Sequence, residues 1–158
     1  YLESAGGDIT RLKLAVLFQM TYVGTPHIWY GDEIGMMGAH DPDCRRPFNW
    51  KYTDDKEKVA LHNYYKKLIR IRKENPVLYY GTFKTLLTKG MIYAFERSYE
   101  GKNIVVVINN EDTKQTIELE TDLGMRSVTD LLTGKQYPLT NGKILEIELD
   151  AGTGAILK

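Results

Sequence analysis

The chain of 158 residues has one cysteine, no excess of charge and no long apolar segment. With only Cys44 it cannot form an internal disulfide, and the sequence shows no base beside the thiol, so we interpret Cys44 as a small, partly buried side chain or a loop residue. Basic and acidic residues balance at 21 each, which gives no electrostatic sign of nucleic-acid or membrane-surface binding. No apolar run approaches the roughly 18–20 residues of a membrane helix. We therefore expect neither nucleic acid nor a membrane as a partner.

Metal-binding and phosphate-binding patterns are also lacking. The three histidines, His27, His40 and His62, do not have the spacing of metal ligands. The sequence contains no glycine-rich phosphate loop and no serine nucleophile elbow. We therefore predict no metal site and no cofactor.

What the chain does contain is ordinary for a globular protein, with 42% hydrophobic and 27% charged residues. It starts at Tyr1 rather than at methionine, and a polar, glycine-containing stretch follows as far as Asp8. This start is typical of a segment from a longer protein, so the lack of a targeting signal says little about location.

The first half has the alternation of helix and strand that is typical of a parallel α/β protein. Asp8 is suited to cap a helix over residues 9–22, which is apolar on nearly all sides and is therefore expected to be buried. The short apolar run of residues 27–30 predicts a buried strand that ends at Gly31. The irregular stretch 35–52 is then a long loop after a strand, the kind of loop in which ligand sites form.

A second helix is predicted over residues 54–74, with a cap from Thr53, Asp54 or Asp55. Its apolar residues form a stripe at helical spacing. Its basic residues lie largely off that stripe, so we interpret them as a solvated face: Lys66, Lys67, Arg70, Arg72 and Lys73. The helix is expected to end before Asn75-Pro76.

From about residue 82 the pattern changes to short strands separated by turn signals. Asn141-Gly142 is a strong hairpin signal, and the apolar residues of 145–149 alternate with glutamates. The fold class is therefore predicted as α/β over residues 1–81 plus an all-β antiparallel sandwich over residues 82–158, packed on the helices. The predicted strands are 82–88, 91–99, 103–109, 114–120, 125–131, 136–139, 143–149 and 153–157.

Two neighbouring acidic residues, Asp32 and Glu33, follow the predicted strand and are candidates for a catalytic pair. A retaining glycosidase needs two carboxyl groups that converge at about 5–5.5 Å across a sugar bond. Adjacent residues of a strand point to opposite faces, so these two cannot converge if the strand continues through them. We therefore predict a structural role for both, as acceptors of loop N–H groups, and no catalytic residue in the chain.

Asp41 and Arg45 lie four residues apart on the long loop. Together they could bind neutral sugar hydroxyls, with Asp41 accepting and Arg45 donating, while Trp50 and Tyr52 stack on a sugar ring. Alternatively, Asp41 and Arg45 pair with each other to order the loop, and the aromatic residues fill the core. Composition alone leaves both interpretations open.

Several segments resemble the α-amylase family, glycoside hydrolase family 13. The family's barrel-end motif is similar to residues 24–36, GTPHIWYGDEIGM, and its last barrel helix is similar to residues 64–76, YYKKLIRIRKENP. Residues 93–97 and 105–110 look like its C-terminal β-domain. The loop 41–47, DPDCRRP, resembles the neopullulanase, cyclomaltodextrinase and maltogenic amylase subgroup.

The resemblance implies that residues 1–81 are the last strand and helices of an incomplete (β/α)8 TIM barrel, and that residues 82–158 are the β-sandwich domain after it. It implies that Asp41 and Arg45 contact an α-glucan oligosaccharide in the intact enzyme. The parent would be a retaining hydrolase of α-1,4 (or α-1,6) glucans such as cyclomaltodextrins, pullulan or maltooligosaccharides. The family's catalytic carboxylates would precede Tyr1, so the chain alone is expected to be inactive. The subgroup implies a cytoplasmic location.

Two other hypotheses stay open: an autonomous carbohydrate-binding or interaction module, and a family relative that has lost its catalytic carboxylates. An incomplete barrel would expose apolar flanks that normally contact the missing N-terminal barrel portion. Such a chain is expected to aggregate, dimerise or swap segments, whereas a true module would be monomeric.

Overall fold

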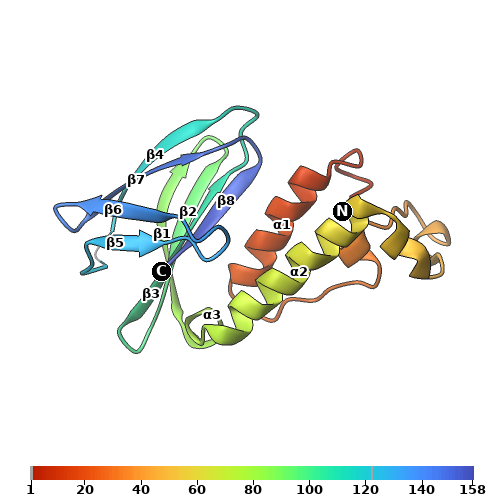
Figure 1. Cartoon of the computed structure of the whole chain (residues 1–158), viewed down its shortest axis with the longest axis horizontal. Helices are drawn as coiled ribbons and strands as arrows, with labels where there is room; N and C mark the ends of the chain where they lie inside the picture. Colours follow the sequence, from red (N-terminus) through yellow and green to blue (C-terminus); the bar gives the residue numbers. More distant parts are fainter. Residues whose placement is uncertain (1, 122) are drawn as a thin grey trace.

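The computed structural model describes residues 2–121 and 123–158, which form three layers: a helical layer and two β-sheets (Figure 1). The helices are α1 (Ile9–Thr21), α2 (Lys56–Glu74) and the short α3 (Val77–Tyr80). Three 3₁₀ turns lie between α1 and α2: η1 (Asp32–Ile34), η2 (Asp43–Arg45) and η3 (Trp50–Asp54). The two long helices agree with the predicted ranges to within two residues.

Both long helices begin at an aspartate cap. The Asp8 carboxylate accepts hydrogen bonds from the N–H groups of Thr10 at 2.8 Å and Arg11 at 3.2 Å. Asp55 does the same for the first turn of α2, accepting from Glu57 at 2.9 Å and Lys58 at 3.3 Å. Each cap satisfies N–H groups that have no partner inside the helix, which fixes where the helix starts.

The β part consists of two four-stranded antiparallel sheets, with strand orders β1-β2-β3-β8 and β4-β7-β6-β5. The antiparallel β prediction is confirmed, and each predicted strand overlaps an observed one. The strands are β1 (Thr82–Lys89), β2 (Ile92–Tyr99), β3 (Lys102–Asn109), β4 (Gln115–Glu120), β5 (Ser127–Thr129), β6 (Gln136–Thr140), β7 (Ile144–Leu149) and β8 (Thr153–Leu157).

Strand β3 is buried on both faces. Ile104, Val106 and Ile108 of β3 lie in the core shared with α1 and α2. Val105 and Val107 lie in the core between the two sheets. Successive strand residues point to opposite faces, so a strand between two cores must be apolar throughout, as β3 is. The sandwich therefore packs on the helices, as predicted.

The prediction of a buried strand at residues 27–30 is wrong for this structure: the segment forms no strand and pairs with none in the described part of the chain. Trp29 is 55% exposed and Tyr30 43% exposed, so the segment is not buried either. A strand needs hydrogen bonds to a neighbour, and none lies beside this segment among the described residues. The chain turns instead into η1, where Ile34 is buried.

The predicted solvated face of α2 is wrong at one position. Arg72 is 5% exposed, and its guanidinium lies against the end of α1. Lys67 also reaches protein, because its ammonium donates to the backbone carbonyl of Leu132. The helical pattern places polar residues off the apolar stripe. It cannot show that backbone carbonyls of other segments lie within hydrogen-bonding distance of those residues.

Candidate functional site

The long loop between η1 and η3 lies beyond the N-terminal end of α2 (Figure 1). It carries both predicted binding residues. The structure brings them together: Arg45 Nε lies 2.8 Å from Asp41 Oδ1, and Arg45 Nη2 donates to Asp41 Oδ2 at 3.0 Å. The side chains are 71% and 60% exposed, respectively. Two parallel bonds give the pair a defined orientation on an open surface.

The pair retains hydrogen-bonding capacity. A guanidinium has five N–H donors and a carboxylate has about four acceptor positions, so two bonds leave several of each unused. A neutral hydroxyl group can accept a hydrogen bond from the guanidinium and can donate one to the carboxylate. The local-pair interpretation is thus confirmed for Asp41 and Arg45, while sugar binding by the same two side chains stays a prediction.

A second ion pair holds the base of the loop. Arg46 donates to Asp43 through Nε at 2.7 Å and Nη2 at 2.8 Å, and the Ala39 N–H donates to the same carboxylate at 3.0 Å. The Ala39 N–H, and after it Arg46, lower the pKa of Asp43 below its ordinary value. Tyr30 donates its hydroxyl to the Arg46 carbonyl at 3.1 Å, which ties the loop to the segment before η1.

Asp32 and Glu33 are held by the backbone of their own turn. Glu33 Oε2 accepts the Gly31 N–H at 2.8 Å. Asp32 bonds to the backbone of Trp29, but burial outweighs this bond and raises the pKa of Asp32 above its ordinary value. The two residues lie in η1 and not in a strand, so the reason given for their structural role fails, while the role itself agrees with these contacts.

A hollow of about 250 Å³ lies beside η1 and the loop. Its lining combines aromatic, sulfur-containing and charged side chains. Trp50, predicted as a stacking residue, is exposed and is not part of this lining, whereas the Tyr52 hydroxyl is bonded to His62 Nδ1 at 3.1 Å. The hollow is lined by Leu2, Glu3, Trp29, Tyr30, Asp32, Met36, Met37, Gly38, Cys44 and Arg46.

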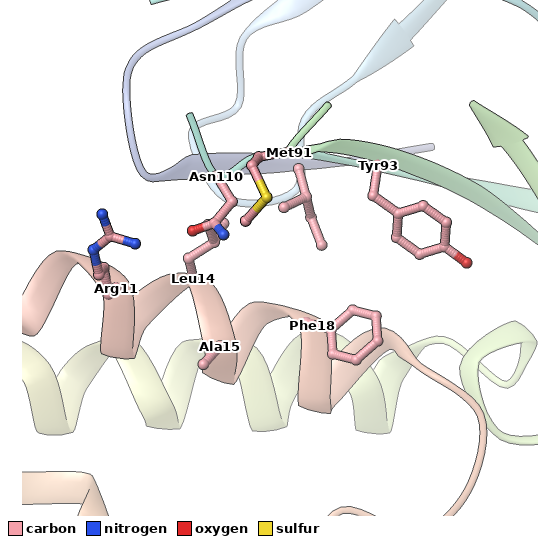
Figure 2. A pocket seen from close by; sticks show the side chains of 8 residues that line it. Arg11, Leu14, Ala15, Phe18, Met91, Tyr93 and Asn110 are labelled. Carbon is pink, nitrogen blue, oxygen red and sulfur yellow. The ribbon is translucent and has the colours of Figure 1, made fainter. Parts of the chain in front are cut away.

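Another hollow, of about 260 Å³, lies between α1 and the β2–β3 end of the first sheet (Figure 2). Leu14, Ala15 and Phe18 come from α1 and face Met91 and Tyr93 of the β part. Its walls are mainly apolar, and its lining residues include no carboxylate and no histidine. They therefore offer no acid–base pair for catalysis.

Within residues 2–121 and 123–158, no group of three or more His, Cys, Asp or Glu side chains could hold a metal ion. No helix of that part of the chain is both long and apolar enough to cross a membrane.

Two buried arginines were missed by the sequence patterns. Arg72 donates to the carbonyls of Met20 at 2.7 Å and Gly24 at 2.6 Å. Arg97 is 1% exposed and donates to the carbonyls of Thr21 at 3.0 Å and of Gly81 at 2.9 Å. Burial lowers the pKa of each guanidinium. The only available signal for Arg97 was its place two residues after Phe95, on the same face of β2.

Known proteins match this chain over most of its length. A cyclomaltodextrinase of Thermoanaerobacter pseudethanolicus is 47% identical over 128 residues, which are 81% of this chain and 22% of that protein. Neopullulanase 2 of Thermoactinomyces vulgaris is 41% identical over 160 residues, 99% of this chain and 27% of its own. Residues 83–152 match the family described as the C-terminal domain of maltogenic amylase. The chain therefore spans about a quarter of these relatives.

Solved structures show the same arrangement of elements. A cyclomaltodextrinase structure superimposes with a TM-score of 0.87 at 33% identity, over 99% of this chain and 27% of that one. An α-amylase from Geobacillus thermoleovorans, solved in complex with acarbose, gives a TM-score of 0.84 at 30% identity, over 94% of this chain and 33% of that one. The helices followed by antiparallel sheets thus match the C-terminal region of amylases.

Proposed function

We propose that the chain is one part of a retaining glycosidase, because it belongs to the α-amylase family, glycoside hydrolase family 13. Within that family it is the C-terminal region of a protein of the neopullulanase, cyclomaltodextrinase and maltogenic amylase group. The parent protein would hydrolyse α-1,4 or α-1,6 bonds of glucans such as cyclomaltodextrins, pullulan and maltooligosaccharides. The observation that carries the proposal is the 41% identity to a neopullulanase over 99% of the chain.

In this proposal residues 1–81 complete a (β/α)8 barrel and residues 82–158 form the domain after it. Helices α1 and α2 would be the last two barrel helices, and residues 27–30 would be the last barrel strand. Among the described residues this segment has no neighbouring strand to pair with, and in the proposal the rest of the barrel would supply one. A closed barrel needs eight strands.

The proposed substrate contacts are Asp41 and Arg45. They stand on the loop after the proposed last strand, and loops at that end of a barrel carry the active site. Their exposed pair offers donors and acceptors to the hydroxyls of a bound glucose unit. The bidentate geometry would fix the direction of those groups before substrate binds.

The catalytic carboxylates are proposed to lie outside this chain. A retaining mechanism needs one carboxylate to attack the sugar and a second to protonate the leaving oxygen. Asp32 and Glu33 are engaged by their own turn, which supports a structural role for both. The chain would therefore contribute part of the substrate cleft and depend on the remaining barrel for the reaction.

A chimera tests this assignment. The corresponding C-terminal region of the Thermoanaerobacter pseudethanolicus cyclomaltodextrinase is replaced by this chain, and cyclomaltodextrin hydrolysis is measured. The chimera is expected to be active, and Asp41→Ala or Arg45→Ala is expected to raise KM by about tenfold, the effect of one charged hydrogen bond. Asp54→Ala, on η3, is the matched control and should leave KM unchanged. An unchanged KM in the Asp41 and Arg45 variants would remove them from the substrate site.

A further inference from the structure

Three tyrosines form a row at the end of α2 that is remote from the candidate loop. Tyr79 and Tyr80 belong to α3, and Tyr99 ends β2. The ring centroids of Tyr79 and Tyr80 are 6.0 Å apart, and those of Tyr80 and Tyr99 are 5.5 Å apart. Tyr80 is 72% exposed and Tyr79 45% exposed. We call these three residues the tyrosine row.

The two buried arginines contact the tyrosine row or the backbone beside it. The Arg72 guanidinium lies 5.2 Å from the centroid of the Tyr79 ring, within the range of a cation–π contact. Arg97 donates to the two carbonyls that lie on either side of Tyr79 and Tyr80 in sequence, those of Leu78 at 3.3 Å and Gly81 at 2.9 Å. The backbone of α3 is therefore fixed before any ligand arrives, which reduces the entropy lost on binding.

Gly81 brings α3 close to the end of β2. A Cβ atom at this position would lie 2.3 Å from the Val77 carbonyl oxygen and 3.1 Å from that of Ser98. Only glycine fits between these backbone groups. The close approach is what places the Tyr80 ring against the Tyr99 ring, although the two residues belong to different elements.

The charged groups that touch the tyrosine row are already engaged. Arg72 is bonded to carbonyls at the end of α1. Glu100 is bonded to the Tyr99 hydroxyl, which raises the pKa of that phenol above its ordinary value. What the row offers is the exposed rings of Tyr80 and Tyr79, each with a phenol group at its rim. Such a surface suits a neutral ligand that has an apolar face and a rim of hydroxyls, and a pyranose ring has both.

We propose that the tyrosine row is a second α-glucan-binding surface, separate from the Asp41–Arg45 loop. It rests on the proposed function, which makes α-glucans the substrates of the parent protein. The two surfaces lie near opposite ends of α2, a helix of 19 residues and so about 28 Å long. A glucan held on the row would therefore not occupy the candidate loop, and the row would concentrate polymer near the protein without taking part in the reaction.

Native electrophoresis in gels that contain soluble amylopectin tests the proposal on this chain. The unaltered chain is expected to be retarded relative to a gel without polymer. The double variant Tyr79→Ala/Tyr80→Ala should bind about tenfold more weakly, equivalent to about 1.4 kcal/mol. Tyr80→Phe keeps the ring and should retain most of the affinity. Met91→Ala removes an exposed apolar side chain elsewhere and serves as the matched control. Urea unfolding of each variant identifies any that fail to fold.

Three outcomes would overturn the proposal: no retardation of the unaltered chain, equal retardation of the double variant, or a double variant that loses self-association and not amylopectin binding. The last would make the row a protein interface. The chimera separates this proposal from the proposed function. An active chimera with no amylopectin binding removes the tyrosine row alone. Amylopectin binding by the chain, with an inactive chimera, removes the proposed activity and leaves the row as a binding surface.

Discussion

At the scale of single residues, the buried arginines connect the helices to the sheet. Arg97 projects from β2 and reaches carbonyls at the end of α1 and around α3. Arg72 projects from α2 and reaches carbonyls at and after the end of α1. Helix C-termini leave carbonyls without partners, and a charged donor there stabilises both the carbonyls and the buried charge. Neither role follows from periodicity, which reports burial of apolar side chains.

Replacement of Arg72 by methionine should be costly. The variant Arg72→Met fills similar space but leaves the buried carbonyl of Met20 and the partly buried carbonyl of Gly24 without this donor. We expect the free energy of unfolding to fall by about 3 kcal/mol, measured by urea denaturation. Arg70→Met, at an exposed position of the same helix, is the control and should change it by less than about 0.5 kcal/mol. Equal effects of the two changes would contradict this account of Arg72.

Asp32 should give the protein a pH dependence of opposite sign to that of an ordinary ion pair. Burial raises its pKa in the folded state, so protonation favours folding. Its contribution is fully present below the ordinary pKa of 3.8 and is lost as the pH rises through the raised value. Asp32→Asn should therefore raise Tm at pH 7 and have little effect near pH 3. A lower Tm at pH 7 would show that the carboxylate is stabilising as an anion.

At the scale of elements, local sequence determined most of the fold. The caps Asp8 and Asp55, the amphipathic stripe of α2 and the turn signals between strands each act over a few residues. For that reason the helix and strand ranges could be predicted closely. The short helix α3 was missed because it has one turn and no apolar period. Residues 27–30 were predicted as a strand because their composition favours one, although pairing depends on residues that are distant in sequence.

The candidate site was predictable only in part, for a related reason. The spacing of Asp41 and Arg45 indicated a pair, and the structure contains that pair. Which ligand the pair contacts depends on the opposite wall of the cleft, and in the proposal that wall belongs to the rest of the barrel. The tyrosine row was not predicted, because Tyr99 reaches Tyr80 only through the packing of α3 on β2.

The hairpin between β6 and β7 provides a test at this scale. Asn141 and Gly142 both have positive φ, at 54° and 70°. A Cβ atom at Gly142 would lie 3.7 Å from the Met125 carbonyl oxygen, which is an ordinary van der Waals contact. A substitution there is therefore disfavoured only by the positive φ angle. Gly142→Ala should lower the free energy of unfolding by about 1 kcal/mol, measured by urea denaturation. Gly142→Asn should cost less, because asparagine adopts this conformation more readily. An equal loss in both variants would point to packing instead.

At the scale of the whole molecule, the β part and the helical part differ in how fully they are covered. The β part has two sheets that cover each other and a third layer of helices on one side. The helical layer is covered by the sheet on one side, and the segment that carries Trp29 and Tyr30 remains exposed. This asymmetry is what the proposal expects of a barrel fragment joined to a complete domain.

The asymmetry predicts self-association of the purified chain. Apolar surface exposed around the segment 25–30 should drive concentration-dependent dimers or larger species, which sedimentation velocity detects. Trp29→Ser should shift the population toward monomer, while Met91→Ser, on the β part, should not. A chain that stays monomeric at all concentrations and binds oligosaccharide would favour the autonomous-module hypothesis.

We propose that this chain contributes to a glucan cleft but does not contain the catalytic carboxylates. The most direct test is to incubate the purified chain with cyclomaltodextrin and with pullulan and to measure the reducing ends released. We predict no release above the buffer control, while the chimera with the cyclomaltodextrinase is active in the same assay. Reproducible release by the chain alone, abolished by Asp32→Asn or Glu33→Gln, would contradict it and would make that acidic pair a catalytic site.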